Sequence, residues 1–498
     1  MTLAGFSPAI QTLLEKIIAA SPPDQPIYLV GGAVRDLLSE RLTDDLDLIL
    51  PEKAIPYGRR LANTLGGAFY PLDIARDTGR IILHTENWGR FTIDCASLRG
   101  NDLESDLRNR DFTINAMALD LRQPSRLIDP LRGAEDLRNK ILRTCSPDSL
   151  VVDPLRILRA VRLSIEFKLK FSAETIQQAR QALPGLAQTS AERLRDEIFQ
   201  LFNGPNPAGA LRTLDNLQAL EFVFPEISEL KGVIQSPPHS EDVWEHTLRT
   251  IQKLGAVFNS LALSHDPESA ANWTLGLVSL RLGRFRLPLH EHLNQQLNPD
   301  RSVRALLLLA ALYHDIGKPH RRQIEPDGRF RFVGHEQLGE EIIRARANGL
   351  RLSNLEVNRL ACVVRHHMRP ILLASSAASP SRRAVYRFFR DTSSAGVDIC
   401  LLSLADILAT YRTTVPQEIW IRQIDVVRTL LEAWWETPHE QVSPPSLLNG
   451  EDLQKLFDLR PGPLIGQLLE AVREAQASGE LHNRQDALEF VRNRLSQG

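Results

Sequence analysis

The sequence predicts an α+β protein, with a head in which helices cover a mixed sheet, followed by all-helical parts. Two observations predict this class. Strand-like and helix-like patterns alternate over residues 1–143, whereas the pattern is helical from Asp153 onward. The chain of 498 residues also exceeds what one core can hold, and its length suggests about three domains.

Composition narrows the class of function. The net charge of −2 excludes binding of nucleic acid through bulk charge, so RNA contacts would need a local basic patch. The four cysteines lie far apart, without the spacing of a disulfide framework or a zinc ribbon, as is typical of a reducing cytosol. The N-terminal segment lacks the pattern of a secretory signal, and the most apolar run, 305–313, is too short to cross a bilayer. We therefore expect a cytoplasmic protein without membrane contact.

The first predicted strand, 27–30, ends at Gly31-Gly32, and a helix is predicted over 33–38. Glycines allow backbone N–H groups to approach a phosphate closely, and the N-terminus of the following helix favours negative charge. A tight strand–helix turn also requires glycine, so this pair alone leaves both interpretations open.

The second predicted strand, 46–50, brings two carboxylates to one face. Asp45 and Asp47 are two residues apart, so in an extended chain their side chains lie opposite those of Leu46 and Leu48. Two such carboxylates, about 7 Å apart at Cβ, can bind one or two Mg²⁺ ions and through them a triphosphate. Without a cation the two charges repel each other. An exposed polar strand edge is the alternative.

Five segments follow one another in a fixed order: GGAVRD (31–36), DLD (45–47), LRNRDFTINAMA (107–118), IDPLRGAEDL (128–137) and DPLRILRAVRL (153–163). Together they resemble class II tRNA nucleotidyltransferases and bacterial poly(A) polymerases, a branch of the polymerase-beta-like nucleotidyltransferases. The resemblance covers residues 25–230. It implies a nucleotidyltransferase head over 1–145 and a helical neck over 146–235 that binds nucleotide and RNA.

The resemblance implies roles for the matching residues. Asp45 and Asp47 would hold catalytic Mg²⁺. Asp94, on a third predicted strand over 91–95, stands where the family has a further acid, with a solvent-facing side chain as the alternative. The implied nucleotide-binding residues are Gly31, Gly32 and Arg35 at the triphosphate, Arg110 and Asp111 at the ribose, and Asp153 and Arg156 at the base edge. Arg159 and Arg162 would add phosphate contacts, unless they are solvated ion-pair partners.

The implied reaction is template-independent addition of nucleotides to the 3′ end of tRNA. The RNA 3′-hydroxyl attacks the NTP α-phosphate with the help of two metal ions, and pyrophosphate leaves. This chain departs from the family twice: Val152 stands where the base-reading motif begins with Glu, and only 12 positions separate Asp94 from Asp106, where CCA-adding members have a longer loop. The short loop favours addition of CC from CTP. Full CCA addition, A addition from ATP and poly(A) synthesis are the alternatives.

A second group of candidate residues lies in the other half of the chain. The apolar run 306–319 contains His314-Asp315, and further candidate ligands are His246, His335, His366, His367 and Asp406. An imidazole or carboxylate in an apolar helix is unfavourable unless it is paired or bound to metal. Histidines that are hydrogen-bonded within the core are the alternative.

The order of these residues resembles the HD metal-dependent phosphohydrolases over 239–410. The resemblance implies His246, His314, Asp315 and Asp406 as metal ligands, with His335 and either His366 or His367 completing a second position. The mixed ligand set suits Mn²⁺, Ni²⁺, Fe²⁺ or Mg²⁺. We expect this HD domain over 236–436 and a helical C-terminal module over 437–498, which resembles the tail of the same nucleotidyltransferases.

Three functions are therefore compared. The first is nucleotide addition, with the 3′ end of tRNA, CTP and ATP as partners. The second is an HD phosphohydrolase whose head only binds RNA, and the third is a structural RNA chaperone. The Asp45/Asp47 pair favours the first, because a head without catalysis has no reason to keep two carboxylates that repel each other.

Overall fold

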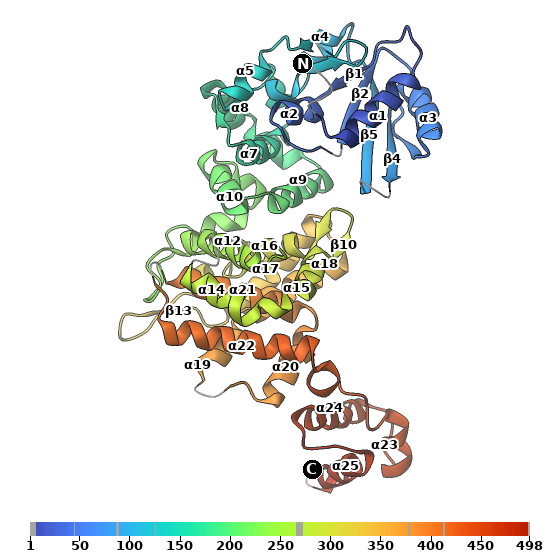
Figure 1. Ribbon diagram of the computed structural model, residues 1–498. Helices are drawn as coiled ribbons and strands as arrows, with labels where there is room; N and C mark the ends of the chain where they lie inside the picture. The colour runs from blue at the N-terminus through green and yellow to red at the C-terminus, as the bar shows by residue number, and fades with distance from the viewer. Residues whose placement is uncertain are drawn as a thin grey trace. The chain divides into compact units, whose positions relative to one another are not determined.

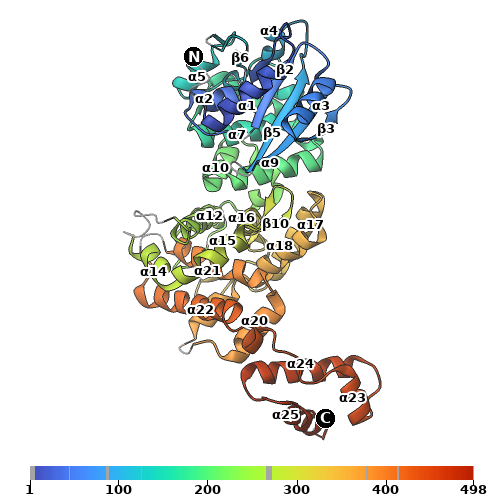
Figure 2. The same ribbon diagram turned by 45° about the vertical axis from the view of Figure 1, so that its right-hand side comes forward.

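The computed structural model describes residues 6–43, 45–85, 89–124, 126–264, 272–376, 379–411 and 414–496. The chain forms two compact units, residues 1–189 with 213–222 and residues 190–212 with 223–498. Figures 1 and 2 follow it from blue at the N-terminus to red at the C-terminus. The residues of the expected neck, 146–235, are shared between the two units, and the expected division into four parts stays a prediction.

The first unit is built on a seven-stranded sheet in the order β3-β4-β5-β2-β1-β6-β7. Its strands are β1 (Tyr28–Val30), β2 (Asp45–Leu50), β3 (Ala68–Asp73), β4 (Thr78–Thr85), β5 (Gly89–Ser97), β6 (Ala118–Asp120) and β7 (Leu127–Ile128). β2 and β5 run parallel, and the other neighbours run antiparallel. The predicted mixed sheet of the head is confirmed, and the three predicted strands are β1, β2 and β5.

Helices surround this sheet. They are α1 (Pro8–Ala19), α2 (Gly32–Leu38), α3 (Ala54–Leu65), α4 (Leu103–Arg108), α5 (Gly133–Arg138), α6 (Ser149–Val152), α7 (Arg156–Phe167) and α8 (Ala173–Ala182). A short parallel pair, β8 (Ile141–Leu142) with β9 (Lys170–Phe171), lies beside them.

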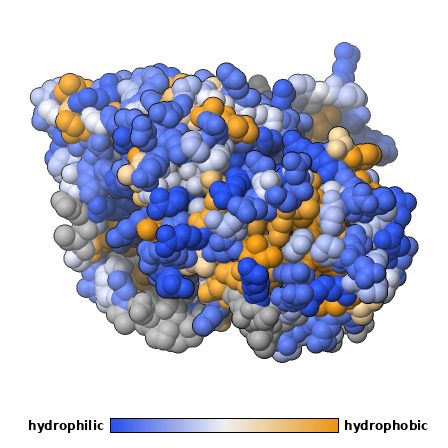
Figure 3. Space-filling view, turned by 90° about the horizontal axis from the view of Figure 1, so that it is seen from above, coloured by the Kyte–Doolittle hydropathy of each residue, from blue (hydrophilic) through white to orange (hydrophobic). Residues whose placement is uncertain are grey.

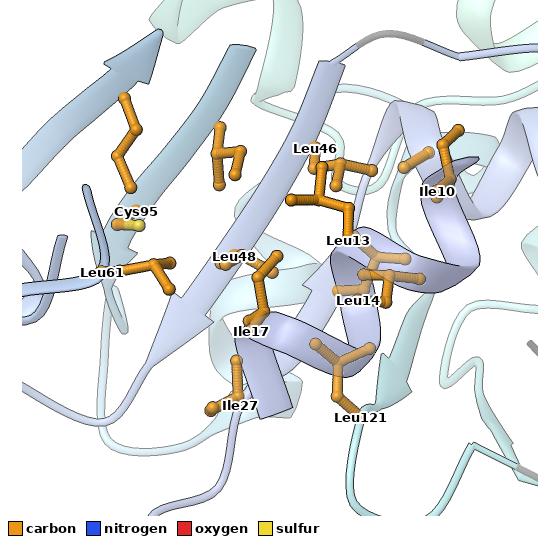
Figure 4. Close-up of a cluster of buried hydrophobic side chains, with 14 of the residues drawn as sticks. Ile10, Leu13, Leu14, Ile17, Ile27, Leu46, Leu48, Leu61, Cys95 and Leu121 are labelled. Atoms are coloured by element: carbon orange, nitrogen blue, oxygen red, sulfur yellow. The ribbon is translucent and has the colours of Figure 1, made fainter. Parts of the chain in front are cut away.

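The core of the first unit fixes which way β2 faces. Figure 4 shows Leu13 and Ile17 of α1 and Leu61 of α3 packed around Leu46 and Leu48 of β2. These side chains are almost fully buried. Because side chains alternate along a strand, the residues between the two leucines point to the opposite face of the sheet. Hydrophobic burial on one face therefore presents the aspartates of β2 on the other.

The second unit is helical. Its helices are α9 (Ala191–Asn203), α12 (Val243–Ser260), α14 (Trp273–Leu282), α15 (Arg286–Asn294), α16 (Val303–Tyr313), α17 (His335–Gly349), α18 (Asn354–His366), α19 (Arg369–Ser375), α20 (Arg382–Thr392), α21 (Ala395–Thr410), α22 (Gln417–Trp435), α23 (Gly450–Phe457), α24 (Pro463–Ser478) and α25 (Arg484–Ser496). α10 (Pro207–Asn216) and α11 (Leu220–Val223) each cross from one unit to the other. Two hairpins complete it: β10 (Gln296–Asn298) with β11 (Arg301–Ser302), and β12 (Gln323–Ile324) with β13 (Phe330–Arg331).

The centre of the second unit consists of α12, α16, α18 and α21, which pack against one another. α16 is buried at every position except Arg304, and α21 is buried along its whole length. Helices that are apolar all round belong in the interior of a large domain. Any charged or imidazole side chain on these helices is therefore held at a defined position inside the unit.

The described residues contain no single helix that is long and apolar enough to cross a membrane, and one bent pair, α20 with α21, meets that criterion by length and composition only. On the face seen in Figure 3, hydrophilic side chains predominate and apolar side chains form patches between them.

Candidate active site and metal centre

Two neighbouring strands bring the predicted head carboxylates together. Asp47 of β2 lies opposite Asp94 of β5 in the parallel register. Asp47 is half-buried, whereas Asp45 is exposed. Burial raises the pKa of Asp47 to about 6; Arg110 opposes this shift, and the charges of Asp94 and Asp45 add to it. The three carboxylates therefore repel one another, and a bound cation would stabilise their charged forms.

Arg80 of β4 holds Asp94 in a two-pronged ion pair. Its Nε and Nη2 donate to Oδ1 and Oδ2 of Asp94, both at 2.7 Å. Such paired bonds fix the plane of a carboxylate as well as its charge. Asp94 is therefore a positioned acid rather than a free solvent-facing one. The sequence alone did not point to Arg80, which becomes visible only from the pairing of β4 with β5.

The glycine turn allows the backbone to pass directly beside Asp47. Gly31 has a φ of +72°, and a Cβ there would lie 2.9 Å from Oδ2 of Asp47 and 3.1 Å from Nη1 of Arg110. A side chain would therefore be strained by the backbone and would also collide with the carboxylate. Glycine is required here both for the turn and for the close approach.

A cavity of about 380 Å³ opens beside the carboxylates. Its lining includes ten residues predicted from the sequence: Gly31, Gly32, Arg35, Asp47, Asp94, Arg110, Asp111, Arg156, Arg159 and Arg162. It also includes four residues that the sequence did not single out: Arg99, Asp106, Asn109 and Asn115. Six arginines and four aspartates in one cavity leave an excess of positive charge, which suits a triphosphate.

Two predicted residues lie elsewhere. Asp45 lines a neighbouring cavity of about 440 Å³, together with Asp47, Asp94 and Arg80. Asp153 is half-buried and is not among the described residues that line the first cavity. Val152, in the position of the family's glutamate, is 77% exposed. The structure thus brings most of the predicted nucleotide-binding residues together in one cavity, but Asp153 is not part of its described lining.

Arg35 is held by three neighbours. Its Nη1 donates to Oδ1 of Asn115 at 2.7 Å, and its Nε and Nη2 donate to Oδ1 of Asp36 at 3.0 and 2.9 Å. The guanidinium also lies 4.3 Å from the centre of the Phe167 ring, a cation–π contact. Arg35 therefore presents a fixed positive charge to the cavity.

Asp111 is a buried carboxylate that remains charged. It accepts from the Phe112 N–H at 2.8 Å, from Asn115 at 3.1 Å and from Arg159 at 3.2 Å. Burial opposes its ionisation, but Arg159 and the hydrogen bonds outweigh burial and lower its pKa. In this structure the carboxylate orients Arg159.

Arg156 is positioned through a residue that the sequence did not indicate. Its Nη1 donates to Oγ of Ser149 at 2.7 Å and to the Ser149 carbonyl at 3.3 Å. Nη1 and Nη2 also reach the carbonyls of Arg110 and Asn109 at 3.4 Å. These contacts hold the guanidinium at the cavity wall.

In the second unit, Asp315 lies between two groups of imidazoles. Its Oδ2 is 3.1 Å from Nε2 of His314 and 3.6 Å from Nε2 of His246. Its Oδ1 is 3.4 Å from Nε2 of His335 and 3.8 Å from Nε2 of His367. These residues form two groups that could each hold a metal ion, with Asp315 shared between them. All five side chains are buried.

Backbone carbonyls orient three of these imidazoles. The Nδ1 atoms of His314, His335 and His367 lie 2.7, 2.8 and 2.8 Å from the carbonyls of Ala311, Phe332 and Val364. Donation by Nδ1 leaves the lone pair on Nε2, which is the usual arrangement of a metal-binding histidine. Burial, together with the neighbouring imidazoles His335 and His314, lowers the pKa of His367 to about 3, so it is neutral, as a metal ligand must be.

Family comparisons agree with this geometry. Residues 27–143 match the poly(A) polymerase head domain, and residues 168–231 match the RNA- and SrmB-binding site of polymerase A. Residues 243–411 match the HD domain, and residues 441–491 match tRNA nucleotidyltransferase domain 2.

Whole-chain relatives decide the family. The chain is 34% identical to the A-adding tRNA nucleotidyltransferase of Deinococcus radiodurans, over 94% of this chain and 96% of that protein. It is 33% identical to the CC-adding tRNA nucleotidyltransferase of Thermus thermophilus, over 93% of this chain and 92% of that protein. The chain belongs to the tRNA nucleotidyltransferase family. A solved CCA-adding enzyme in its apo form shares the fold, with a TM-score of 0.61 at 19% identity, over 99% of this chain and 96% of that one.

Membership in the tRNA nucleotidyltransferase family implies catalysis with a divalent metal ion, and the residues present fit one in each unit. In the head, carboxylates on one face of the sheet are the ligands that Mg²⁺ prefers. In the HD part, Nε2 of His314, which faces Asp315, is buried without a hydrogen-bond partner among the described residues. Buried polar atoms without a partner are costly, and a bound metal ion would remove part of that cost.

Of the two remaining predicted metal ligands of the HD part, one lies at the site and the other does not. Oδ1 of Asp406 lies 3.0 Å from Nε2 of His246, so it joins the site. His366 is only half-buried and belongs to neither metal group of the described residues. The sequence did not indicate His239, whose ring centre is 5.0 Å from that of His246, or Lys318, whose Nζ is 2.7 Å from Oδ2 of Asp315. The Lys318 contact is local, three residues along the chain from Asp315, whereas His239 reaches His246 from the segment before α12.

Proposed function

We propose that this nucleotidyltransferase adds CC, from CTP, to the 3′ end of tRNA. The observation that carries nucleotide addition is the Asp47–Asp94 pair at the edge of an arginine-lined cavity. No side-chain nucleophile is needed. The RNA 3′-hydroxyl attacks the α-phosphate in line, and pyrophosphate is the leaving group.

The chain's own residues would bind and orient the substrates. Asp45 and Asp47 would hold Mg²⁺, with Asp94 fixed beside them by Arg80. Bound Mg²⁺ would supply activation of the hydroxyl and neutralisation of the charge on the leaving group. Gly31, Gly32, Arg35, Arg110 and Arg159 would bind the triphosphate and ribose, and Arg156 would read the base edge from the cavity wall. Asp153, three residues before Arg156 and outside the described lining, would join it in reading the base.

The short connection after β5 supports the choice of CC. β5 ends at Ser97 and α4 begins at Leu103, so the connection is residues 98–102. Asp106 of α4 is 3% exposed and accepts from the Arg99 N–H at 2.9 Å. This segment is thus tied to the cavity wall, whereas a pocket that changes from CTP to ATP needs a longer loop.

Addition of the terminal A is the second candidate. It is favoured by the 34% identity to an A-adding relative, which is as high as the identity to the CC-adding one. The nucleotide that is added therefore decides between the two candidates.

We also propose that the HD part binds Mn²⁺, Ni²⁺, Fe²⁺ or Mg²⁺ and hydrolyses a phosphoester. His246, His314, Asp315 and Asp406 would form one metal position, and His335 with His367 would complete a second through Asp315. The shared carboxylate supports this proposal, because bridging aspartates hold two ions close together. A cytoplasmic location follows from the proposed substrate, and a head, a neck, an HD domain and a C-terminal module are the proposed parts.

Single-nucleotide extension tests the proposal. Labelled tRNAs that end before CCA, after C and after CC are incubated with Mg²⁺ and CTP, ATP or both. We expect two C residues on the first tRNA, one on the second and none on the third. Addition of A to the third tRNA alone would establish the A-adding candidate instead. Absence of any extension would overturn nucleotide addition and leave the phosphohydrolase as the main activity.

A further inference from the structure

A cavity of about 280 Å³ lies in the second unit, away from both sites described above. Four helices form it: α12 with the residues directly after it, α15, α16 and α21. These helices lie close together in Figures 1 and 2. Arg304 enters it from the start of α16, and His314 directly follows the end of that helix, ten residues further along the chain. Ten residues correspond to about 15 Å along the helix axis, so the cavity is distinct from the HD metal site.

Arg304 lacks the counter-charge that its neighbours possess. Among the described residues, no carboxylate forms an ion pair with it and no acceptor takes a hydrogen bond from it. Two other half-buried arginines of this unit have a carboxylate partner: Arg301 pairs with Glu356 at 2.6 Å, and Arg346 pairs with Glu226 at 2.7 Å. Burial lowers the pKa of Arg304, and no charge compensates for it.

An unpaired guanidinium inside a protein is costly, because its charge loses water without gaining a partner. Phe258 supplies the only described aromatic contact, with its ring centre 5.4 Å from the guanidinium carbon. A cation–π contact recovers only part of that cost. An anion in the cavity would supply the missing counter-charge.

The other residues that line the cavity indicate the chemistry of the part of the ligand that does not contact Arg304. Leu261, Leu289 and Leu401 are at most 5% exposed and form apolar walls. Asn259, His290 and Asn294 are exposed polar residues that also line the cavity. One cation between apolar walls fits a molecule with a single anionic group on a compact apolar body.

We propose that this cavity binds a small organic anion, a carboxylate or a phosphate monoester on an apolar body, with the anionic group on Arg304. The site is independent of the proposed nucleotide addition, because it shares no described residue with the head cavity.

The test uses calorimetric titration of the full-length protein with benzoate, with benzylphosphonate, which resists hydrolysis, and with uncharged benzyl alcohol. We expect at least one anion to bind more tightly than the alcohol, and the preferred anion to identify the class of ligand. Arg304→Met should weaken binding of that anion about tenfold or more, since it removes a charge-assisted contact. Arg422→Met, which removes an exposed arginine of α22, is the matched control and should leave binding unchanged.

Thermal unfolding without ligand gives a second measurement. Because Arg304 is half-buried and no described residue pairs with its charge, Arg304→Met should unfold at the same temperature or a higher one. A fall of several degrees would overturn the proposal, since the guanidinium would then have a stabilising role in the empty protein. Equal affinity for benzyl alcohol, equal affinity of the Arg304→Met protein, or no binding of either anion would overturn it as well.

Discussion

Asp47 and Asp94 lie opposite each other on parallel strands, and of these two described carboxylates only Asp94 forms an ion pair. Arg80 donates two hydrogen bonds of 2.7 Å to Asp94, whereas burial raises the pKa of Asp47 to about 6. One member of the pair is thus a fixed anion, and the other is a carboxylate that burial keeps from ionising fully. This asymmetry predicts where a cation would bind and how stability should respond to pH.

Asp47→Asn is expected to abolish nucleotide addition and to stabilise the metal-free protein above pH 6. The folded protein holds the Asp47 proton more strongly than the unfolded chain, so its contribution to stability falls as pH rises from about 4 to about 6. The lost stability is at most about 3 kcal/mol, at about 1.4 kcal/mol per pKa unit. Asparagine removes this loss because it does not ionise.

Thermal unfolding in chelator between pH 4 and 8 measures this effect. The difference in Tm between the variant and the native protein should grow up to about pH 6 and then level off. Asp73→Asn is the matched control, because that carboxylate is more exposed and pairs with Arg76 outside the cavity. A difference in Tm that does not change with pH would contradict the raised pKa, and continued nucleotide addition would remove Asp47 from the proposed metal site.

Arg80→Gln is expected to lower kcat for nucleotide addition about tenfold to a hundredfold, as loss of a partner that orients a metal-site ligand commonly does. The KM for CTP should change little, because Arg80 lines the neighbouring cavity rather than the nucleotide cavity. Arg80→Lys should recover part of the activity, since it keeps the charge but loses the two-pronged geometry. Steady-state kinetics of single-nucleotide extension measure both constants. A rise in KM with unchanged kcat would instead indicate that Arg80 contacts the nucleotide.

The strands that could be predicted from the sequence are those whose apolar residues are buried in the core. β1, β2 and β5 were expected because each carries apolar residues that pack in the core, as Leu46 and Leu48 do. β3 was not expected, because its residues are mostly exposed and its pairing with β4 leaves no period-two pattern in the sequence. Edge strands of this kind are specified by their neighbours.

The same distinction applies to the sites. Gly31 and Arg110 could be predicted because each lies in a short motif on which the family resemblance rests. Arg80 and Ser149 could not, because each reaches its partner through strand pairing or helix packing. His366 and His367 show the limit most clearly: adjacent in sequence, they point to different surroundings, and only the helix orientation selects His367.

His367→Ala is expected to reduce the metal bound by the HD part, whereas His366→Ala should not. In the proposed site His367 completes the second position, so its loss should lower the content from about two ions to about one per chain. Elemental analysis after loading with Mn²⁺ and gel filtration measures the ratio of metal to protein. His314→Ala with Asp315→Ala should remove metal and phosphohydrolysis together but spare nucleotide addition. Equal metal content in the two single variants would contradict the second position.

Glu474→Gln is expected to loosen the contact between α24 and α20. Glu474 is 16% exposed and lies 3.3 Å from Arg383, 2.6 Å from Arg387 and 3.8 Å from Arg390. Partly exposed ion pairs contribute up to about 1 kcal/mol each, and salt weakens them. The variant should therefore be cleaved severalfold faster by a broad-specificity protease within residues 443–447, and the native protein should approach the same rate in about 0.5 M salt. Glu451→Gln is the control, because its pair with Lys455 lies within α23. If both variants are cleaved at the native rate, apolar packing rather than charge holds α24 in place.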